Sequence, residues 1–357
     1  MAEGIYERNR IHNRILLFEP FELLVDSDIF QRTRKLKQTG LVNLVYPECE
    51  HSRFAHSLGA FDIACQITEQ LKGHGNPHNI TSADRVCVSA AALLKNIGHL
   101  PYSQLLDNKF QNGEYNLLKY VEMSTRIVDH LFFENIKIRK GFEPYLGTDE
   151  TTYRTNIIFI KELIVSKEML NIHLLDDSHD LKTKEEINRS CWPMKGRPIE
   201  KSFLYDIVSN VQNGNDVDKM DYLLRDSAAA NIPINLNISG LKRIIENTKV
   251  VIDPESGILR IGYALKCVAD VSAIADSARE LQSKVYQHKT VLGINVLFFD
   301  ALTKAAQHLE YKGSDRKYKL HEVTDDIEAF SKVTDNIEDE VLIALENFSK
   351  NGLDFEL

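Results

Sequence analysis

The chain has 357 residues, of which 43% are hydrophobic and 27% are charged, so it is long enough to bury a large core. Its formal net charge of -9 excludes a global basic field that would concentrate nucleic acid. No apolar run approaches the ~20 residues that a membrane-spanning helix needs, so neither nucleic acid nor a membrane is expected as a partner.

The cysteines and the first residues of the chain indicate a compartment. The five cysteines are dispersed and form no CxxC pair, which is typical of free thiols in a reducing environment. Residues 1–15 carry charges throughout and lack the apolar core of a signal peptide. We therefore expect a cytoplasmic protein.

Helical periodicity dominates the rest of the sequence. The predicted helices cover residues 18–37, 53–71, 114–131, 202–225 and 264–308, and one more begins near Thr81. Gly40 should end the first helix, and residues 41–46 should form an extended piece or turn. Alternating Val and Ile within residues 233–263 predict a small β-element.

These patterns predict a mainly α fold. We divide it into a core over residues 1–311 and a peripheral acidic helical tail over residues 312–357. The stretch 141–200 is the least regular part of the core and is interpreted as an insert or lobe.

Polar residues gather at the ends of apolar elements, in residues 50–59, 95–107 and 215–226. The second group follows a run from Val86 to Leu94 without a charged side chain, as expected for a helix buried on all faces. Polar side chains at the end of such a helix cost free energy unless they meet partners there. Taken singly, each group has a structural explanation, such as a capping histidine or an i,i+4 ion pair.

Together, the three groups resemble the motif set of the HD-domain dNTP triphosphohydrolases, over roughly residues 6–311. The first matching motif comprises Asp26, Phe30, Gln31, Arg32, Arg34, Lys37, Gln38 and Gly40. The second comprises Val45, Tyr46, Pro47, His51, Arg53, Phe54, His56, Ser57, Leu58 and Gly59. The third runs from Asn213 to Asp226, and a fourth from Tyr286 to Lys289. The resemblance implies an HD-domain helical core with a small β-element and peripheral C-terminal helices.

The resemblance also implies roles for individual residues. The family holds one divalent metal with four ligands, of which His56 and Asp218 are the first and fourth. The nucleotide-binding residues implied by position are Gln38, Arg53, Lys219, Tyr222, Asp226 and Tyr286. His99 and Asp107 match catalytic positions.

The chain differs from the family at the His-Asp pair that gives the HD-domain fold its name. Lys95 and Asn96 replace the adjacent His-Asp pair that supplies the other two metal ligands. Two further family histidines fall at Gln104 and Val121. Where the family has an arginine ahead of the last motif, this chain has Ala278, with Arg279 beside it.

These replacements bear directly on metal binding. A Lys ammonium has no lone pair, and an Asn amide carries no charge. Two remaining ligands fall short of the three that catalytic metal sites usually keep. We therefore expect no cofactor, and predict that Lys95 occupies the space of the metal and forms an ion pair with Asp218.

Three functions follow from this interpretation. The first is a catalytically degenerate relative that binds a nucleotide and acts as a regulatory or assembly subunit, as a homo-oligomer or within a larger complex. The second is an active hydrolase that holds Mn, Fe, Zn, Ni or Mg with replacement ligands such as His51, His99 or Asp216. The third is nucleic acid binding through the basic residues 32–37, which the acidic balance disfavours.

Overall fold

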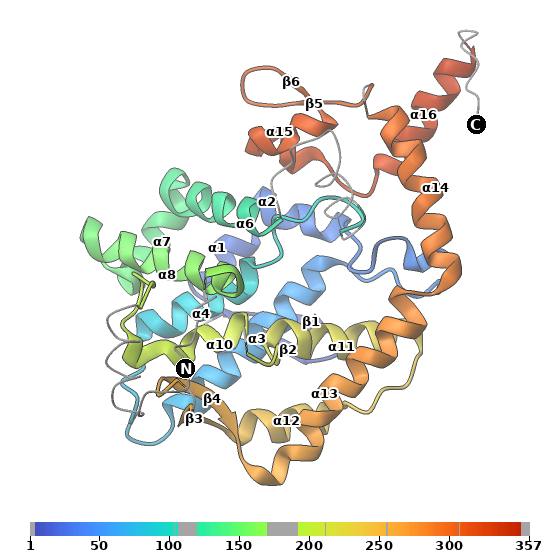
Figure 1. Ribbon diagram of the computed structural model, residues 1–357. Helices are drawn as coiled ribbons and strands as arrows, with labels where there is room; N and C mark the ends of the chain where they lie inside the picture. Colours follow the sequence, from blue (N-terminus) through green and yellow to red (C-terminus); the bar gives the residue numbers. More distant parts are fainter. Residues whose placement is uncertain are drawn as a thin grey trace.

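The computed structural model describes residues 4–103, 105, 120–169, 192–210, 212–254, 256–306 and 308–350. It confirms the mainly helical fold, with short two-stranded sheets at the periphery (Figure 1). The helices in the first half of the chain are α1 (Phe21–Val25), α2 (Asp28–Gln31), α3 (Arg53–Lys72), α4 (Ser82–Leu94), α6 (Tyr120–Asp129), α7 (Ile136–Leu146) and α8 (Glu150–Met169). Those in the second half are α10 (Tyr205–Val208), α11 (Val217–Ala230), α12 (Ile238–Glu246), α13 (Val268–Leu281), α14 (Lys289–Ala305), α15 (Ile327–Lys332) and α16 (Ile337–Lys350).

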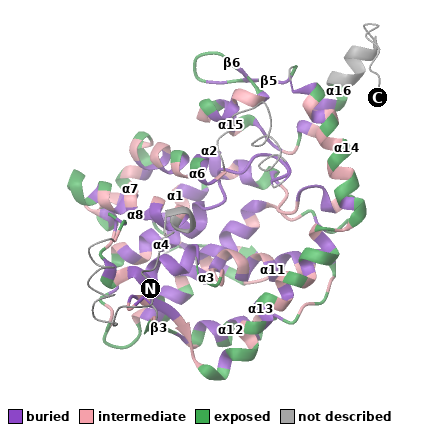
Figure 2. Cartoon of the chain, viewed as in Figure 1, coloured by how far each residue is buried: buried purple, intermediate pink, exposed green. Residues whose placement is uncertain are grey.

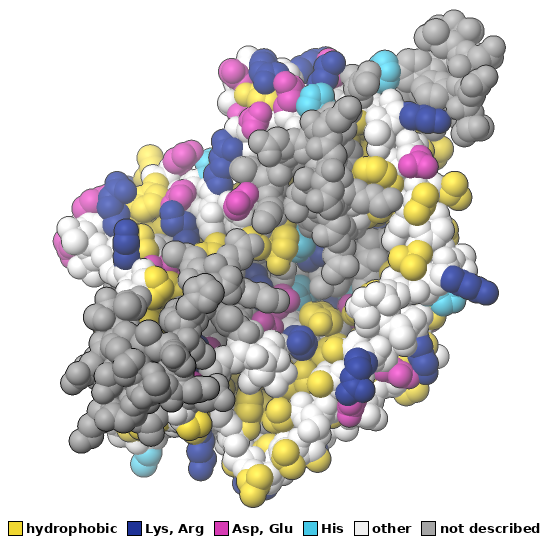
Figure 3. All heavy atoms as spheres, in the orientation of Figure 1, with side chains coloured by type: hydrophobic (Ala, Val, Ile, Leu, Met, Phe, Trp, Pro, Cys, Tyr) yellow, Lys and Arg dark blue, Asp and Glu magenta, His cyan; other side chains and the backbone are white. Residues whose placement is uncertain are grey.

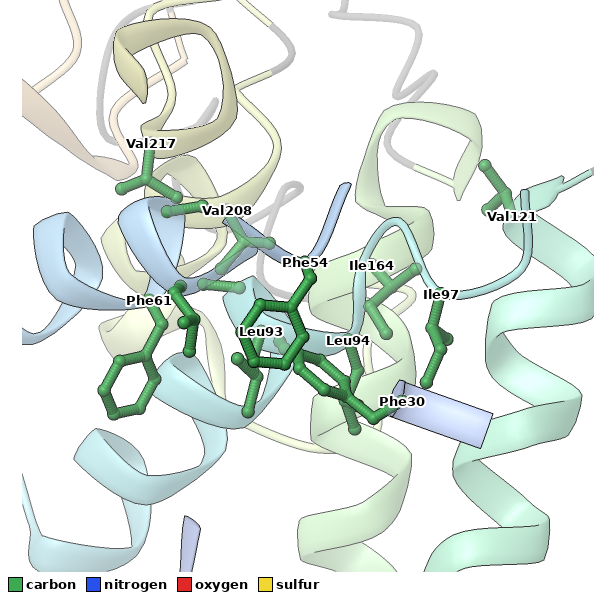
Figure 4. Close-up of a cluster of buried hydrophobic side chains, with 14 of the residues drawn as sticks. Phe30, Phe54, Phe61, Leu93, Leu94, Ile97, Val121, Ile164, Val208 and Val217 are labelled. Atoms are coloured by element: carbon green, nitrogen blue, oxygen red, sulfur yellow. The ribbon is translucent and has the colours of Figure 1, made fainter. Parts of the chain in front are cut away.

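Helices α3, α4 and α11 form the centre of the molecule, where most residues are buried (Figure 2). The predicted start of α4 is confirmed, because Thr81 and Asp84 form a reciprocal capping box. Helix α3 begins where predicted, with Ser52 as its N-cap. Around them, apolar side chains from distant parts of the chain pack together, among them Phe61, Leu93 and Val217 (Figure 4).

Three antiparallel hairpins complete the fold: β1 (Gly4–Asn9) with β2 (Asn13–Phe18), β3 (Thr248–Ile252) with β4 (Leu259–Tyr263), and β5 (Glu310–Lys312) with β6 (Lys317–Lys319). The second of these is the predicted β-element. The other two were missed because β5 and β6 are only three residues long, and in β2 the unbroken apolar run Ile15–Phe18 hides the alternate burial of Ile15 and Leu17.

The helix predicted over residues 18–37 is wrong as a continuous element. It divides into α1, α2 and a 3-10 turn at Arg32–Lys35. The Ser27 hydroxyl donates to the carbonyl of Leu24, and the Gln31 amide donates to that of Val25, so local hydrogen bonds end α1. Of the extended piece or turn expected over residues 41–46, the structure has the turn, because Gly40–Leu44 forms a 3-10 helix.

Two further predicted helices are interrupted. The one expected over 202–225 is divided between α10 and α11 by the loop that carries Asp216. The one expected over 264–308 is divided at His288, whose backbone is extended and whose side chain accepts from Thr290 N. In both places a polar side chain caps the next helix, and such caps are hard to distinguish from a polar helix face in the sequence.

The expectation of irregular structure after residue 141 is wrong for the described residues up to 169. Helices α7 and α8 lie there, and α8 buries Tyr153, Ile157 and Leu163 in the main core. The division of the chain at residue 311 stays a prediction. Among the described residues, no helix is long and apolar enough to cross a membrane.

Candidate functional site

A cavity of about 490 Å³ opens beside the ends of α3, α4 and α11. It brings together predicted site residues from distant parts of the sequence: Gln38, Arg53, Asn96, His99, Asp218, Tyr222, Asp226 and Tyr286. Part of this hollowed face is visible in Figure 3, beside hydrophobic side chains along α14. A cavity of this size is in the range of small-molecule sites.

His56 lies fully buried beneath this cavity and connects two carboxylates. Its Nδ1 lies 2.7 Å from an Asp221 oxygen, and its Nε2 lies 3.0 Å from an Asp218 oxygen. Burial alone would lower the pKa of His56, but the hydrogen bonds to Asp218 and Asp221 raise it to about 9. Both ring nitrogens therefore donate, and Nε2 has no lone pair to offer a metal.

Asn96 contacts both remnant ligands. Its Nδ2 donates to Asp218 Oδ1 at 2.6 Å and lies 3.0 Å from His56 Nε2. The carboxylate fixes this orientation, because an amide oxygen at that distance from Asp218 would be repelled. The amide oxygen faces His99, whose Nε2 lies 3.2 Å away. Because His56 Nε2 also donates, the amide nitrogen bonds to Asp218 and only lies beside His56, so Asp218 Oδ1 accepts from both side chains.

Lys95 lies on the other side of Asp218. Its Nζ is 3.8 Å from Asp218 Oδ2 and 3.7 Å from Asp216 Oδ2, and it donates to the Val208 carbonyl at 2.8 Å. Burial opposes its charge, yet the carboxylates of Asp216 and Asp218 raise its pKa. The predicted ion pair is present. The expectation that Lys95 occupies the space of the metal stays a prediction, and Asn96 also contacts both remnant ligands.

These residues do not fit a divalent metal. Asp218 has its charge matched by Lys95 and a hydrogen bond from Asn96, while His56 donates through both nitrogens. Among the residues that the structure describes, no group of three His, Cys, Asp or Glu side chains could hold a metal ion. A metal at this position would have to displace an ammonium and an amide and deprotonate a histidine.

Behind His56, Asp221 forms a second buried cluster that the sequence did not reveal. It accepts from Arg225, from His12 Nε2 at 2.7 Å and from His56. Gly59 leaves the room for this cluster, because a Cβ there would lie 1.8 Å from Asp221 Oδ1. The only indication in the sequence was the i,i+4 spacing of Asp221 and Arg225, interpreted as a structural ion pair.

His99 is held against a tyrosine at the cavity wall. Its ring stacks on that of Tyr120, with centroids 4.0 Å apart and planes 9° from parallel. Val121, at a family histidine position, also lines the cavity. The other predicted catalytic residue, Asp107, and the replaced position Gln104 lie outside the described residues.

Asp226 has both carboxylate oxygens engaged. One lies 2.7 Å from His51 Nε2 and the other accepts from the Tyr286 hydroxyl at 2.5 Å. His51, considered above as a replacement ligand, is thus paired with Asp226 and is not among the residues that line the cavity. This geometry favours a structural role for His51.

The two cations among the predicted nucleotide-binding residues, Arg53 and Lys219, separate in the structure. Arg53 lines the cavity, and its Nε donates to Ser103 Oγ at 2.7 Å. The Nζ of Lys219 instead lies against Gly214 in the loop before α11, and Lys219 is not among the lining residues. Arg279 is 79% exposed and pairs with Asp276. Of the two predicted nucleotide-binding cations, the cavity therefore keeps Arg53.

The basic stretch 32–37 is not a uniformly solvated helix face. Arg32 is buried, donates to the carbonyls of His99 and Val333, and stacks over Phe330. It joins the C-terminal segment to the cavity wall, so it is not available to a nucleic acid. This finding further disfavours the nucleic acid hypothesis.

Backbone hydrogen bonds to Asp335 connect two segments of the same cavity wall. Tyr102 and Ser103 both have positive φ angles, of 53° and 51°, which non-glycine residues seldom adopt. The Asp335 carboxylate accepts from the backbone N–H groups of Tyr102 and Lys37 at 3.0 and 2.6 Å. These bonds hold two wall segments together from the C-terminal side.

The protonated state of His56 predicts a pH dependence of stability. Because its pKa rises from 6.5 to about 9 on folding, the stabilisation is complete below pH 6.5 and is lost as the pH rises through about 9. The loss should approach about 3 kcal/mol, since each pKa unit corresponds to about 1.4 kcal/mol. Urea denaturation between pH 6 and pH 10 measures it.

His74→Gln, at an exposed turn, is the control and should leave that pH profile unchanged. A wild-type stability that stayed flat across this range would show that His56 is neutral in the folded protein.

The mainly helical fold is consistent with an HD domain, and in its cavity Lys95 and Asn96 lie beside His56 and Asp218. Comparison with known proteins shows which members of this class the chain resembles. The chain is 34% identical to the deoxynucleoside triphosphate triphosphohydrolase SAMHD1 of Homo sapiens and 32% identical to that of Danio rerio, in each case over 93% of this chain and 50% of the relative. A SAMHD1 homolog of Dictyostelium discoideum is 28% identical over 80% of this chain and 46% of its own length.

No protein-family model matches the chain. It is nonetheless a homologue of the SAMHD1-like HD-domain dNTP triphosphohydrolases, with about a third of its residues identical over 93% of its length. The chain spans about half the length of the curated relatives it matches.

Proposed function

We propose that this protein is a catalytically degenerate member of its family, one that binds a nucleotide-like ligand in the cavity without metal-dependent triphosphate hydrolysis. The observation that carries the proposal is that Asp218 Oδ1 accepts from both Asn96 Nδ2 and His56 Nε2, while Lys95 Nζ lies 3.8 Å from Asp218 Oδ2. Removal of the metal removes the group that would polarise a phosphate and generate hydroxide at neutral pH. Val121 and Gln104, at family histidine positions, remove acid–base groups as well.

The cavity itself argues for retained binding. Gln38, Tyr222 and Tyr286 still line it, although the chemistry they would serve lacks its metal. A protein that binds without turnover can act through assembly, as a homo-oligomer or as a subunit of a larger complex. Helix α14 offers a surface for such contacts, since Leu292, Val296 and Leu297 are all exposed on it.

The test combines elemental analysis with an activity assay on the purified full chain. We expect less than stoichiometric Mn, Fe, Zn and Ni, and no triphosphate released from any dNTP in the presence of Mn²⁺. Stoichiometric metal together with triphosphate release would instead establish the alternative, an active hydrolase with a rewired metal site.

A further inference from the structure

Two adjacent residues of the cavity wall have a strained backbone. Tyr102 and Ser103 both line the cavity, and their φ angles of 53° and 51° lie in the left-handed region that residues other than glycine avoid. A backbone in this region costs free energy, so it persists only where the surrounding structure holds it there. The contacts on these two residues therefore decide the shape of this part of the wall.

Tyr102 is bonded to residues 333–338, a segment near the C-terminus that we call the strap. The Asp335 carboxylate accepts from Tyr102 N at 3.0 Å, and the Tyr102 hydroxyl donates to the Asp335 carbonyl at 2.8 Å. The same hydroxyl lies 3.3 Å from a carboxylate oxygen of Glu338. The strap thus holds the strained residue by its backbone and by its side chain.

The strap also holds the neighbouring segment of the wall. The Asp335 carboxylate accepts from Lys37 N at 2.6 Å, and Asp335 N donates to the Lys35 carbonyl at 3.1 Å. Gly40 lies close against the strained loop, since a Cβ there would be 3.0 Å from the Tyr102 carbonyl oxygen. Because the two segments are in contact and share one carboxylate, release of the strap should loosen both.

Further hydrogen bonds connect the strap to side chains of the site. Ser103 Oγ accepts from Arg53 Nε at 2.7 Å, so a change in the backbone of Ser103 moves the acceptor of this buried cation. Arg32 donates to the carbonyl of Val333, within the strap, and to that of His99, at the start of the loop. Docking of the strap is therefore felt at residues that line the cavity.

The carboxylate at the centre of the strap is held in place against an opposing free energy. Removal from water raises the pKa of the Asp335 carboxyl, and the hydrogen bonds from Lys37 N and Tyr102 N offset only part of this rise. The ionised carboxylate is thus less favourable in the docked strap than in water. Both this desolvation and the strain of the loop favour release, whereas the hydrogen bonds favour docking.

We infer that residues 333–338 form a releasable strap that sets the shape of the cavity wall from the C-terminal side. The docked strap keeps Tyr102 and Ser103 in the left-handed region. When the strap is released, the loop relaxes to negative φ angles and the Ser103 hydroxyl moves away from Arg53. This device requires neither a metal nor a ligand, so it goes beyond the proposed function and can fail without it.

The experiment is hydrogen exchange measured by mass spectrometry on the full chain, without added ligand, for the wild type and Asp335→Ala. The variant removes the acceptor of Lys37 N and Tyr102 N, so peptides over residues 35–40 and 98–103 should exchange at least about tenfold faster. Peptides from α4 and α8 should exchange as in the wild type. Asn336→Ala, at the exposed next position, is the matched control and should change none of these rates.

A second pair of variants tests the strain. In the Asp335→Ala protein, Ser103→Gly removes the penalty for a positive φ angle at that position, so the wall should keep its shape more often. Exchange at residues 35–40 should become slower than in Asp335→Ala alone. Ser103→Ala loses the same hydroxyl but keeps the strain, and it should give no such recovery.

Three results would contradict the strap. Wild-type exchange at residues 98–103 in Asp335→Ala would show that the strap does not hold the loop. An equal acceleration in α4 and α8 would show that Asp335 supports the whole fold and not a local device. Faster exchange with Ser103→Gly than without it would show that the loop stores no strain. None of these results bears on metal content or dNTP hydrolysis, which test the proposed function separately.

Discussion

Gly59→Ala is expected to destabilise the protein by about 4 kcal/mol or more, the largest effect of any single methyl group considered for this chain. The added Cβ would lie 1.8 Å from Asp221 Oδ1 and 2.6 Å from Arg225 Nη2. Both side chains are buried and bonded to each other, so neither can move without leaving a charge unpaired. His56 would lose its orientation in the same step.

The matched control is Gly293→Ala on α14, where a Cβ would meet no atom within 4 Å. In an exposed helix this change should stabilise by up to about 1 kcal/mol. Urea denaturation measures both variants. A Gly59→Ala protein that unfolded at the wild-type urea concentration would show that the Asp221 cluster is not packed as the structure has it.

Restoring the family pair with Lys95→His and Asn96→Asp together should produce a metal site. The double change removes the ammonium beside Asp218 and the amide that donates to Asp218, and it adds two ligands to the two that remain. We expect about one Mn²⁺ per chain. At a metal concentration 100 times the dissociation constant, binding should stabilise the fold by about 2.7 kcal/mol.

Elemental analysis and a thermal shift with Mn²⁺ report this result without relying on activity. The control is the double variant Lys95→Arg with Asn96→Gln, which changes the same two positions but restores no metal ligand. Triphosphate release should stay low even in the metal-bound variant, because Val121 and Gln104 do not replace the missing histidines. If the Lys95→His and Asn96→Asp variant folded but bound no metal, residues other than this pair would also prevent metal binding.

Local signals predicted the helices whose ends carry strong caps. Thr81 and Asp84 form a capping box three residues apart, and the apolar run that follows them is buried in the core, as its composition required. The interruptions at Ser27 and His288 could not be seen in the same way, because each depends on a side chain that bonds to backbone in preference to water.

For the site, the sequence by itself determined the family, the positions of His56 and Asp218, and the loss of the His-Asp pair, because each is a matter of residue identity at a fixed spacing. Only the tertiary structure decided how Lys95 and Asn96 lie against the other site residues. The Asn96 amide donates to Asp218, Lys95 pairs with two carboxylates, and Lys219 and Arg279 lie away from the cavity. The contacts of Lys95 and Asn96 depend on distances of a few ångströms to residues more than a hundred positions away, and electrostatic energies change steeply over such distances.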